Sequence, residues 1–277
     1  MKSGRRRTAA GAAFVGALGL LVLSAPVAHA ADTGITVSDI VINNGKPIVV
    51  GTSKAVEPPL TFNIALPSGY STADPYRYDA DPFLYRGSRK TAADTGKNFI
   101  GPGGYTCYEI SSKRARCEGD LYIDPHSSRK QVGSNSDATT WKVAVSLRLF
   151  KASGAVKAQE YETRSQTVRL KRAAKVTTAD ATPEPVTKGK KITVTGKLTR
   201  ANWSTKKYNA YSDRTVSLQF RAKGTDSYKT VKKATTSSTG ALKATVTAST
   251  DGFYRWKYNG NTTTGTAVGA ADYVDVR

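Results

Sequence analysis

Apolar side chains recur at every second position through most of this sequence, and helical spacing is nearly absent. The longest run has Trp141, Val143, Val145, Leu147 and Leu149 separated by small or polar residues. This period of two is typical of β-strands that bury one face. The pattern therefore restricts the chain to an all-β fold in which sheets cover a core.

The second half repeats the alternation in shorter runs. Its apolar positions are Ile192, Val194 and Leu198; Val216, Leu218 and Phe220; Leu242, Ala244 and Val246; Tyr254, Trp256 and Tyr258; and Val274 and Val276. Six or seven short strands in about 100 residues indicate an immunoglobulin-like sandwich. Trp256 stands where antibody domains have their second cysteine. We therefore expect packing, and not a disulfide, to stabilise this domain.

The first 30 residues have the pattern of a cleavable signal peptide. An apolar run at 12–23 and the small-x-small signal Ala28-His29-Ala30 follow a positive segment made of Lys2, Arg5, Arg6 and Arg7. The run has about 12 residues, whereas a membrane span needs about 20. We expect a secreted, extracellular chain that is cut after Ala30 and has no membrane span. The residues after the arginines favour the general secretory route over the twin-arginine route.

The remaining length exceeds that of a common domain, so we expect two. A proline-containing stretch with few large apolar residues lies between 173 and 191. We predict an N-terminal β-sandwich-like domain at 31–172, a linker and first strand region at 173–191, and an immunoglobulin-like domain at 192–277. Residues 32–172 hold 20 bases and 14 acids, whereas 173–277 hold 18 and 7. The positive charge is therefore concentrated in the second domain.

Cys107 and Cys117 are the only cysteines. A pair in an exported protein indicates a disulfide. A hairpin folded about Ser112 would place the two residues directly opposite each other, within bridging range. A redox-active pair is the alternative, but the spacing is not Cys-x-x-Cys.

Two further segments of the first domain lead to predictions. Asn43-Asn44-Gly45 predicts a hairpin that joins strands at 35–42 and 47–52. Residues 67–97, rich in Asp, Tyr, Pro and Gly, are predicted to form an irregular insertion.

Several motifs of the second half carry a family resemblance. They are Leu198–Trp203, Val216–Arg221, Phe253–Trp256 and Ala270–Val276. Together they resemble the C-terminal immunoglobulin-like module of secreted actinobacterial proteins of the Streptomyces type. The resemblance implies an extracellular module, and it provides no catalytic residue to transfer.

Nothing in the sequence indicates a catalytic centre. His126, the one histidine left after cleavage, lies in a polar, turn-like segment without a Gly-x-Ser-x-Gly elbow, which favours a surface loop. The sequence has no regular spacing of zinc ligands and no pair of carboxylates that points to glycoside hydrolysis. We expect no enzymatic activity and no cofactor.

Asp74, Asp79 and Asp81 place three carboxylates within a short segment, and such oxygens are the ligands that calcium prefers. Arg77 lies inside the segment, and the glycine and final glutamate of an EF-hand loop are missing. Asp-Pro is also common in turns. A turn is the preferred interpretation, and a calcium site is the alternative.

Basic residues of the second domain are candidates for binding a polyanion, such as the teichoic acid of a Gram-positive wall. They are Lys188, Lys190, Lys191, Lys206, Lys207, Lys232 and Lys233. The alternative is that lysines on edge strands prevent aggregation. The signal peptide argues against nucleic acid as a partner.

Trp203, Tyr208 and Tyr211 lie in a polar connection between two predicted strands. Exposed rings there would be candidates for stacking on sugars. The alternative is that the tryptophan caps the open end of the sandwich.

These observations favour a secreted, non-catalytic binding protein, associated with the cell envelope through its basic second domain and an anionic wall polymer or glycan. A ligand-independent extracellular scaffold is the alternative. A hydrolase or inhibitor acting through residues 67–97 is a third interpretation.

Overall fold

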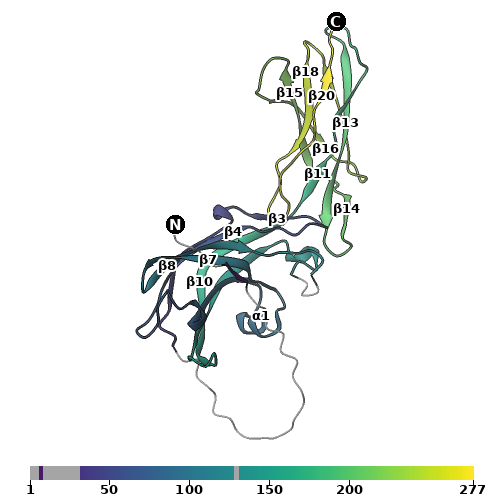
Figure 1. The fold of residues 1–277 in the computed structure, drawn as a ribbon. Helices are drawn as coiled ribbons and strands as arrows, with labels where there is room; N and C mark the ends of the chain where they lie inside the picture. Colours follow the sequence, from purple (N-terminus) through teal and green to yellow (C-terminus); the bar gives the residue numbers. More distant parts are fainter. Residues whose placement is uncertain (1–5, 9–31, 128–130) are drawn as a thin grey trace. The chain divides into compact units, whose positions relative to one another are not determined.

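The computed structural model describes residues 6–8, 32–127 and 131–277 (Figure 1). For residues 6–8 it describes the backbone alone. The predicted cleavage site, the apolar run, Lys2 and Arg5 lie outside these residues. Within the predicted signal peptide, the backbone of strand β1 (Arg6–Thr8) pairs antiparallel with β7. None of the helices in the described ranges has the length and apolar character needed to span a bilayer.

The chain divides into two compact units, and both are discontinuous in sequence. Unit 1 comprises residues 1–48, 55–131 and 140–169. Unit 2 comprises residues 49–54, 132–139 and 170–277. The contiguous domains predicted from composition therefore differ from these units, because two short segments of the first half belong to unit 2.

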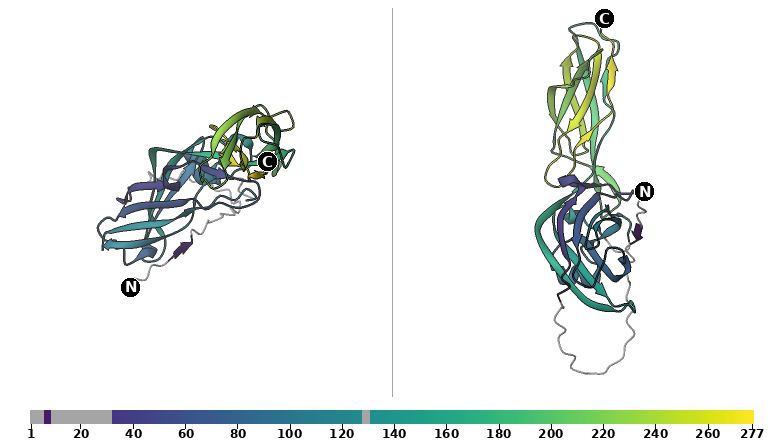
Figure 2. Two further views of the ribbon diagram at one scale, coloured as in Figure 1. Left: turned by 90° about the horizontal axis from the view of Figure 1, so that it is seen from above. Right: turned by 60° about the vertical axis from the view of Figure 1, so that its left-hand side comes forward.

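The first two sheets form a sandwich, and their strand orders are β1-β7-β8-β4-β2 and β3-β10-β9-β5-β6 (Figure 2). The first sheet contains β2 (Thr36–Ile42), β4 (Pro59–Ala65), β7 (Pro102–Ser111) and β8 (Arg114–Leu121). The second contains β3 (Ile48–Val50), β5 (Tyr78–Tyr85), β6 (Phe99–Ile100), β9 (Thr140–Phe150) and β10 (Val156–Arg172). Short helices are η1 (Asn43–Gly45), η2 (Pro75–Arg77), α1 (Arg89–Thr95) and, in unit 2, η3 (Asn135–Asp137).

The alternating run of the first half forms β9, as predicted. Its five apolar side chains, from Trp141 to Leu149, are all at most 4% exposed. Because successive side chains of a strand point to opposite faces, this period alone is enough to select the buried face. The prediction of an all-β sandwich is confirmed.

The predicted hairpin at Asn43-Asn44-Gly45 is wrong. All three residues have positive φ angles of 51°, 52° and 72°, so the chain does turn there. However, β2 pairs with β4, whereas β3 joins the other sheet. Turn chemistry determines a local reversal, but the sheet that each flanking strand joins depends on residues far away in sequence.

The predicted irregular insertion at 67–97 contains regular structure. Strand β5 lies between β9 and β6, and α1 begins after Ser88, whose side chain accepts a hydrogen bond from the backbone of Thr91. Phe83, Leu84 and Tyr85 of β5 are all buried. Burial of consecutive residues removes the period of two in this second half of the strand, so the alternation at residues 78–81 does not continue along the chain.

Unit 2 is an immunoglobulin-like sandwich of two sheets. In one, β13 (Lys191–Asn202) pairs with β11 (Ala174–Val176), β12 (Asp180–Thr182), β14 (Lys207–Ala210) and β17 (Ala241–Thr247). The other has the order β16 (Lys229–Thr235), β15 (Thr215–Ala222), β18 (Gly252–Tyr258) and β19 (Ala267–Val268), and β20 (Asp272–Val274) also pairs with β18. The predicted linker at 173–191 thus contains β11 and β12.

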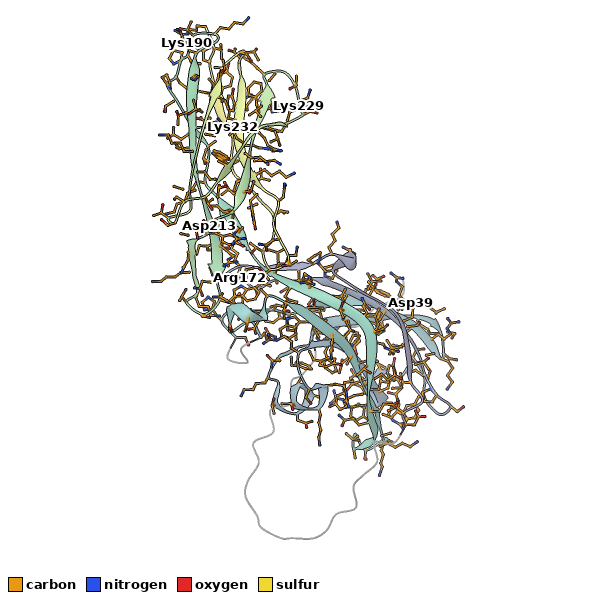
Figure 3. All side chains as sticks on the ribbon, turned by 180° about the vertical axis from the view of Figure 1, so that it is seen from behind. Asp39, Arg172, Lys190, Asp213, Lys229 and Lys232 are labelled. Carbon is orange, nitrogen blue, oxygen red and sulfur yellow. A yellow bond between two sulfur atoms is a disulfide. The ribbon has the colours of Figure 1, made fainter. Side chains whose placement is uncertain are left out.

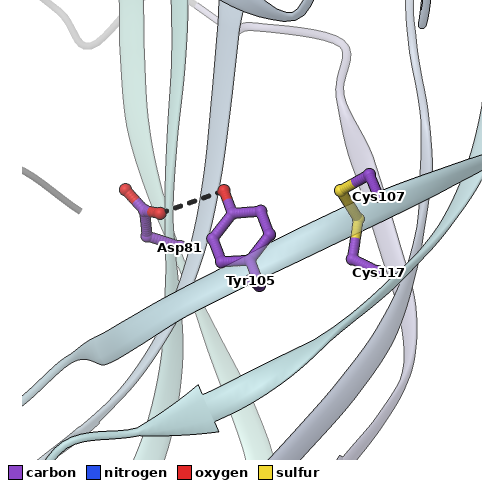
Figure 4. Close-up of a disulfide and its surroundings, with 4 residues drawn as sticks. All are labelled: Asp81, Tyr105, Cys107 and Cys117. Carbon is purple, nitrogen blue, oxygen red and sulfur yellow. Dashed lines mark hydrogen bonds between the residues drawn. A yellow bond between two sulfur atoms is a disulfide. The ribbon is translucent and has the colours of Figure 1, made fainter. Parts of the chain in front are cut away.

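The disulfide between Cys107 and Cys117 is confirmed. The two residues are directly paired in the β7–β8 hairpin, and their Cα atoms lie 4.0 Å apart (Figure 4). The sulfur of Cys117 is in the core of unit 1, since this residue is fully buried.

We expect Cys107→Ala/Cys117→Ala to lower the free energy of unfolding of unit 1 by about 2–3 kcal/mol, because the crosslink restricts the unfolded chain. Chemical denaturation of the oxidised wild type and the double variant measures the loss. A reducing agent should produce the same loss in the wild type and no further change in the variant. Equal stability of wild type and variant under oxidising conditions would contradict the prediction.

Candidate ligand-binding surface

The seven lysines selected from the sequence do not form one site. Lys188, Lys190 and Lys191 lie where β13 begins, whereas Lys206 and Lys207 lie beyond its end. A strand of this length, 12 residues, separates the two groups by about 35 Å. Figure 3 shows Lys190 at one end of unit 2 and Lys232 along its side. The predicted polyanion patch is therefore dispersed.

Lys232 and Lys233, both on edge strand β16, lie on opposite faces of their sheet. Lys233 pairs with Ser217 and shares its outward face, whereas Lys232 pairs with the buried Leu218. The Lys232 Nζ donates a 2.9 Å hydrogen bond to the carbonyl oxygen of Thr245. Adjacent positions in a strand cannot contribute to one face, because its side chains alternate.

The aromatic residues proposed to stack on sugars are not available for that role. Trp203 is fully buried, and its Nε1 donates to the carbonyl oxygens of Val50 and Gly51 at 3.2 and 3.0 Å. Tyr211 is 5% exposed, and half-buried Tyr208 is covered by Lys175, whose Nζ lies 4.1 Å from the ring centroid. Trp203 and Tyr211 are both buried, so the three rings do not form an exposed platform, and the burial of Trp203 agrees with the alternative that this ring covers the core.

The three aspartates proposed as calcium ligands do not come together. Asp79 and Asp81 lie two residues apart on β5, and both contact the guanidinium of Arg148, at 3.0 and 3.4 Å. Asp74 precedes η2 in the turn. No group of three or more acidic, histidine or cysteine side chains that could hold a metal occurs in the part of the chain described.

Asp81 lies in a partly buried position between a positive and a phenolic partner. Tyr105 of β7 donates a 3.1 Å hydrogen bond to its Oδ1 (Figure 4). Burial raises the pKa of Asp81 to about 6, and the charge of Asp79 adds to this, whereas Arg148 and Tyr105 act in the opposite direction.

Because its pKa is raised in the folded state, ionised Asp81 destabilises the protein, and that cost disappears as the carboxyl is protonated. In the wild type, we expect the unfolding free energy to rise by an amount on the order of 2 kcal/mol as the pH falls from about 7 to about 4. Asp81→Asn should lack this rise, because it has no carboxyl group to protonate. Urea unfolding at several pH values measures this. Asp74→Asn, which removes an exposed carboxylate from the nearby turn, is the matched control. A variant with the pH dependence of the wild type would contradict the assignment.

His126 is exposed, and its backbone N–H donates to the Oδ1 of Asp124 at 2.8 Å. This is turn geometry, in which a side-chain carboxylate replaces a backbone acceptor. The imidazole therefore projects from a surface turn.

The outward face of the β16-β15-β18 sheet carries a group of cations and aromatic rings. Its outward positions are Gln219 and Arg221 of β15, Phe253, Arg255 and Lys257 of β18, and Lys233 of β16, by the pairing of these strands. The alternate residues of β15 and β18, among them Leu218 and Trp256, form the core. We call the outward set, together with Tyr228, the basic-aromatic face.

Tyr228 lies between the two arginines of this face. The Cζ of Arg255 is 3.6 Å from the centroid of the Tyr228 ring, and the Cζ of Arg221 is 5.4 Å from it. Arg221 also lies 4.2 Å from the centroid of Phe253, and the Nε of Arg255 donates to Gln219 Oε1 at 3.0 Å. The Arg221 Nη1 also donates to the carbonyl oxygen of Thr225. Stacking holds a guanidinium by its faces, so the N–H groups on its edge that make no hydrogen bond within the protein can bind an oxyanion.

The charge of this face is not balanced by acids. Strands β15, β16 and β18, with the loop from β15 to β16, contain seven basic residues and one acid, Asp226. No ion pair in the described residues involves Arg221, Lys233, Arg255 or Lys257. Lys223, next to the face, is already paired with Asp251 at 3.6 Å, and its hydrogen bond with Tyr273 raises its pKa.

Neither arginine of this face was among the residues predicted from the sequence to bind a polyanion. Their alternation with core residues was visible, since Arg221 follows Phe220 and Arg255 precedes Trp256. The alternation itself shows which residues of each strand point outward, and this indicates the cations of the face better than the clusters of lysine do. Tyr228 lies outside the strands and has no such signal.

No protein-family model matches the chain, and a search of curated proteins gives no match. Among solved structures, the D0-D1 domain of intimin is 13% identical, covering 86% of this chain and 98% of that chain, with a TM-score of 0.25. Three N-terminal domains of the outer capsid protein Hoc of bacteriophage RB49 are 11% identical, covering 88% and 69%, with a TM-score of 0.27. TM-scores this low do not establish a shared arrangement.

Proposed function

We propose that this is a secreted, non-catalytic binding protein that attaches to an anionic glycopolymer of the cell envelope through the basic-aromatic face of unit 2. The observation that supports it is the set of Arg221, Arg255, Lys257 and Lys233, which share one face and form no ion pair with an acid in the part of the chain that the structure describes. The predicted export signal supports the proposal, because an exported protein would meet such polymers.

The chemistry of the face matches a phosphate-rich polymer. Guanidinium groups bind phosphate oxygens through paired N–H donors. Tyr228 and Phe253 stack on these guanidinium groups and hold them in place. Teichoic acid, the phosphate polymer of Gram-positive walls, is a polymer of this class.

A scaffold that binds no ligand would also tolerate lysines on β16, since charges on an edge strand prevent sheet-to-sheet association. That explanation does not extend to Arg221 and Arg255, because β15 and β18 are interior strands of the sheet. Their stacking on aromatic rings therefore favours the binding function.

Co-sedimentation of the purified chain with Gram-positive cell walls tests the proposal. Walls are used intact or stripped of teichoic acid, each at low and high salt. We expect binding to intact walls at low salt and its loss on stripping or in high salt, because screening weakens exposed charge interactions. Binding to neither wall preparation would contradict the proposal.

A further inference from the structure

Unit 2 contains a second group of arginines, separate from the basic-aromatic face, and one of them is buried. Arg172, the last residue of β10, is 8% exposed (Figure 3). Its Nε is buried and has no hydrogen-bond partner among the residues that the structure describes. Buried arginines in proteins are normally paired, because an uncompensated charge away from water is strongly destabilising.

Arg200 of β13 is a close neighbour of Arg172 on the same sheet face. β11 continues from β10 and pairs with β13 so that Ala174 is opposite Arg200, which places Arg172 and Arg200 diagonally on one face. The Arg200 Nη1 donates to Thr264 Oγ1 at 3.4 Å. Two like charges are thus adjacent where burial is substantial.

A third arginine, Arg214, completes the group around Tyr211. The Cζ atoms of Arg200 and Arg214 lie 3.9 and 4.9 Å from the centroid of the Tyr211 ring. No ion pair in the described residues involves Arg172, Arg200 or Arg214. The group therefore carries three positive charges without a carboxylate.

The electrostatic state of the group agrees with this geometry. Burial lowers the pKa of Arg172 to about 10, and repulsion from Arg200 adds to the effect. Arg172 is still charged at neutral pH, so an anion bound beside the pair would offset the repulsion between the two guanidinium groups.

We propose that Arg172 and Arg200 form a binding site for one small oxyanion, phosphate or sulfate. Two guanidinium groups can present several N–H donors to the oxygens of such an ion. Because Arg172 is largely buried, the site admits a single ion or a terminal phosphate group and not an extended polymer. It therefore differs from the basic-aromatic face, whose cations point outward from β15 and β18.

Thermal unfolding of the purified chain in inorganic phosphate, with chloride at matched ionic strength as reference, tests the site. Binding to the folded state alone makes the Tm rise with ligand concentration. We expect a site-specific rise of about 3 °C. Sulfate should act similarly, and dimethyl phosphate shows whether a phosphodiester, as in a wall polymer, also binds.

Phosphate and sulfate also stabilise folded proteins without binding to a site. Arg172→Met and Arg200→Gln should retain that general increase and lose the site-specific part. Lys229→Gln removes one positive charge from the exposed edge strand β16 and is the matched control, which should respond as the wild type does. Without phosphate, Arg172→Met should have a higher Tm than the wild type, because an unpaired buried charge has been removed.

Two results would overturn the proposal. One is a phosphate-dependent rise in Tm that is the same in the wild type and in Arg172→Met. If Arg172→Met does not fold, Arg200→Gln takes its place in this comparison. The other is a Tyr211 phenolate at neutral pH, which would already neutralise the group. Burial raises the pKa of Tyr211, but hydrogen bonds with Thr264, Tyr258 and Asn261 outweigh it and lower the pKa. Ultraviolet absorbance, with Tyr211→Phe as reference, detects the phenolate. The wall-binding experiment reports on the other face, so either proposal can fail alone.

Discussion

Replacing Trp256 by alanine should lower the free energy of unfolding of unit 2 by about 3–5 kcal/mol, the range for removal of a large buried side chain. Trp256 is fully buried in the core of the sandwich, and its Nε1 donates to the carbonyl oxygen of Thr195 at 2.9 Å. The variant would lose this contact, would leave the carbonyl without its donor, and would create a cavity.

Gly196 shows how closely the neighbouring strand approaches this ring. A Cβ atom at Gly196 would lie 2.7 Å from Trp256 Cδ1, which is closer than van der Waals contact permits. The glycine is therefore required for packing, and the tryptophan fills the space that the glycine leaves. Unit 2 has no disulfide to compensate for the loss, since the only cysteines form the hairpin bridge of unit 1.

Calorimetry is the appropriate measurement, because a chain of two units can unfold in separate transitions. We expect Trp256→Ala to shift the transition of unit 2. Lys257→Ala, one residue further along β18 with its side chain outward, should change stability by no more than about 0.5 kcal/mol. A Trp256→Ala variant that unfolds with the same stability as Lys257→Ala would show that the ring does not stabilise the sandwich.

Neutralising the basic-aromatic face should weaken binding to teichoic acid about 100-fold at low salt, if each of four charges contributes about 0.7 kcal/mol. The variant is Arg221→Gln/Lys233→Gln/Arg255→Gln/Lys257→Gln. The salt dependence of the remaining binding should also become weaker, because fewer counterions are released. Titration of the polymer, followed by fluorescence or calorimetry, measures both effects.

The matched control removes the same number of charges from the ends of β13. It is Lys188→Gln/Lys190→Gln/Lys191→Gln/Lys207→Gln, and its affinity should fall by about threefold or less, because these positions lie on or beside β13 and β14, in the other sheet of unit 2. Equal losses in the two variants would show that net charge, and not the face, determines binding. Retained affinity in the first variant would contradict the proposed function directly.

Local patterns were sufficient to predict the class of fold and several of its parts. The alternation from Trp141 to Leu149 and the runs that became β13, β15, β17 and β18 identified strands and their buried faces correctly. The spacing of Cys107 and Cys117 predicted their pairing in the hairpin. Each of these features depends on residues close together in the sequence, and therefore each can be predicted from the sequence alone.

Residues far apart in sequence decided the rest. The turn at Asn43-Asn44-Gly45 was recognised, but the strands that it joins belong to different sheets. The polar segment around Trp203 was compatible with an exposed ring or with a cap of the sandwich, and the ring is buried beneath the backbone of Val50 and Gly51. Its accessible area depends on a segment about 150 positions earlier in the chain.

The candidate surface and the arginine group follow the same division. The amino-acid sequence by itself determined where the strands with alternating apolar residues form, which of their residues point outward and how much positive charge the second half carries. Only the tertiary structure decided which cations share a face, because strand register brings Arg221 beside Phe253 and Gln219 beside Arg255 while it separates Lys232 from Lys233. The physical reason is that side-chain alternation is a local property of a strand, whereas register, burial and the absence of a counter-charge around Arg172 depend on partners that only folding brings together.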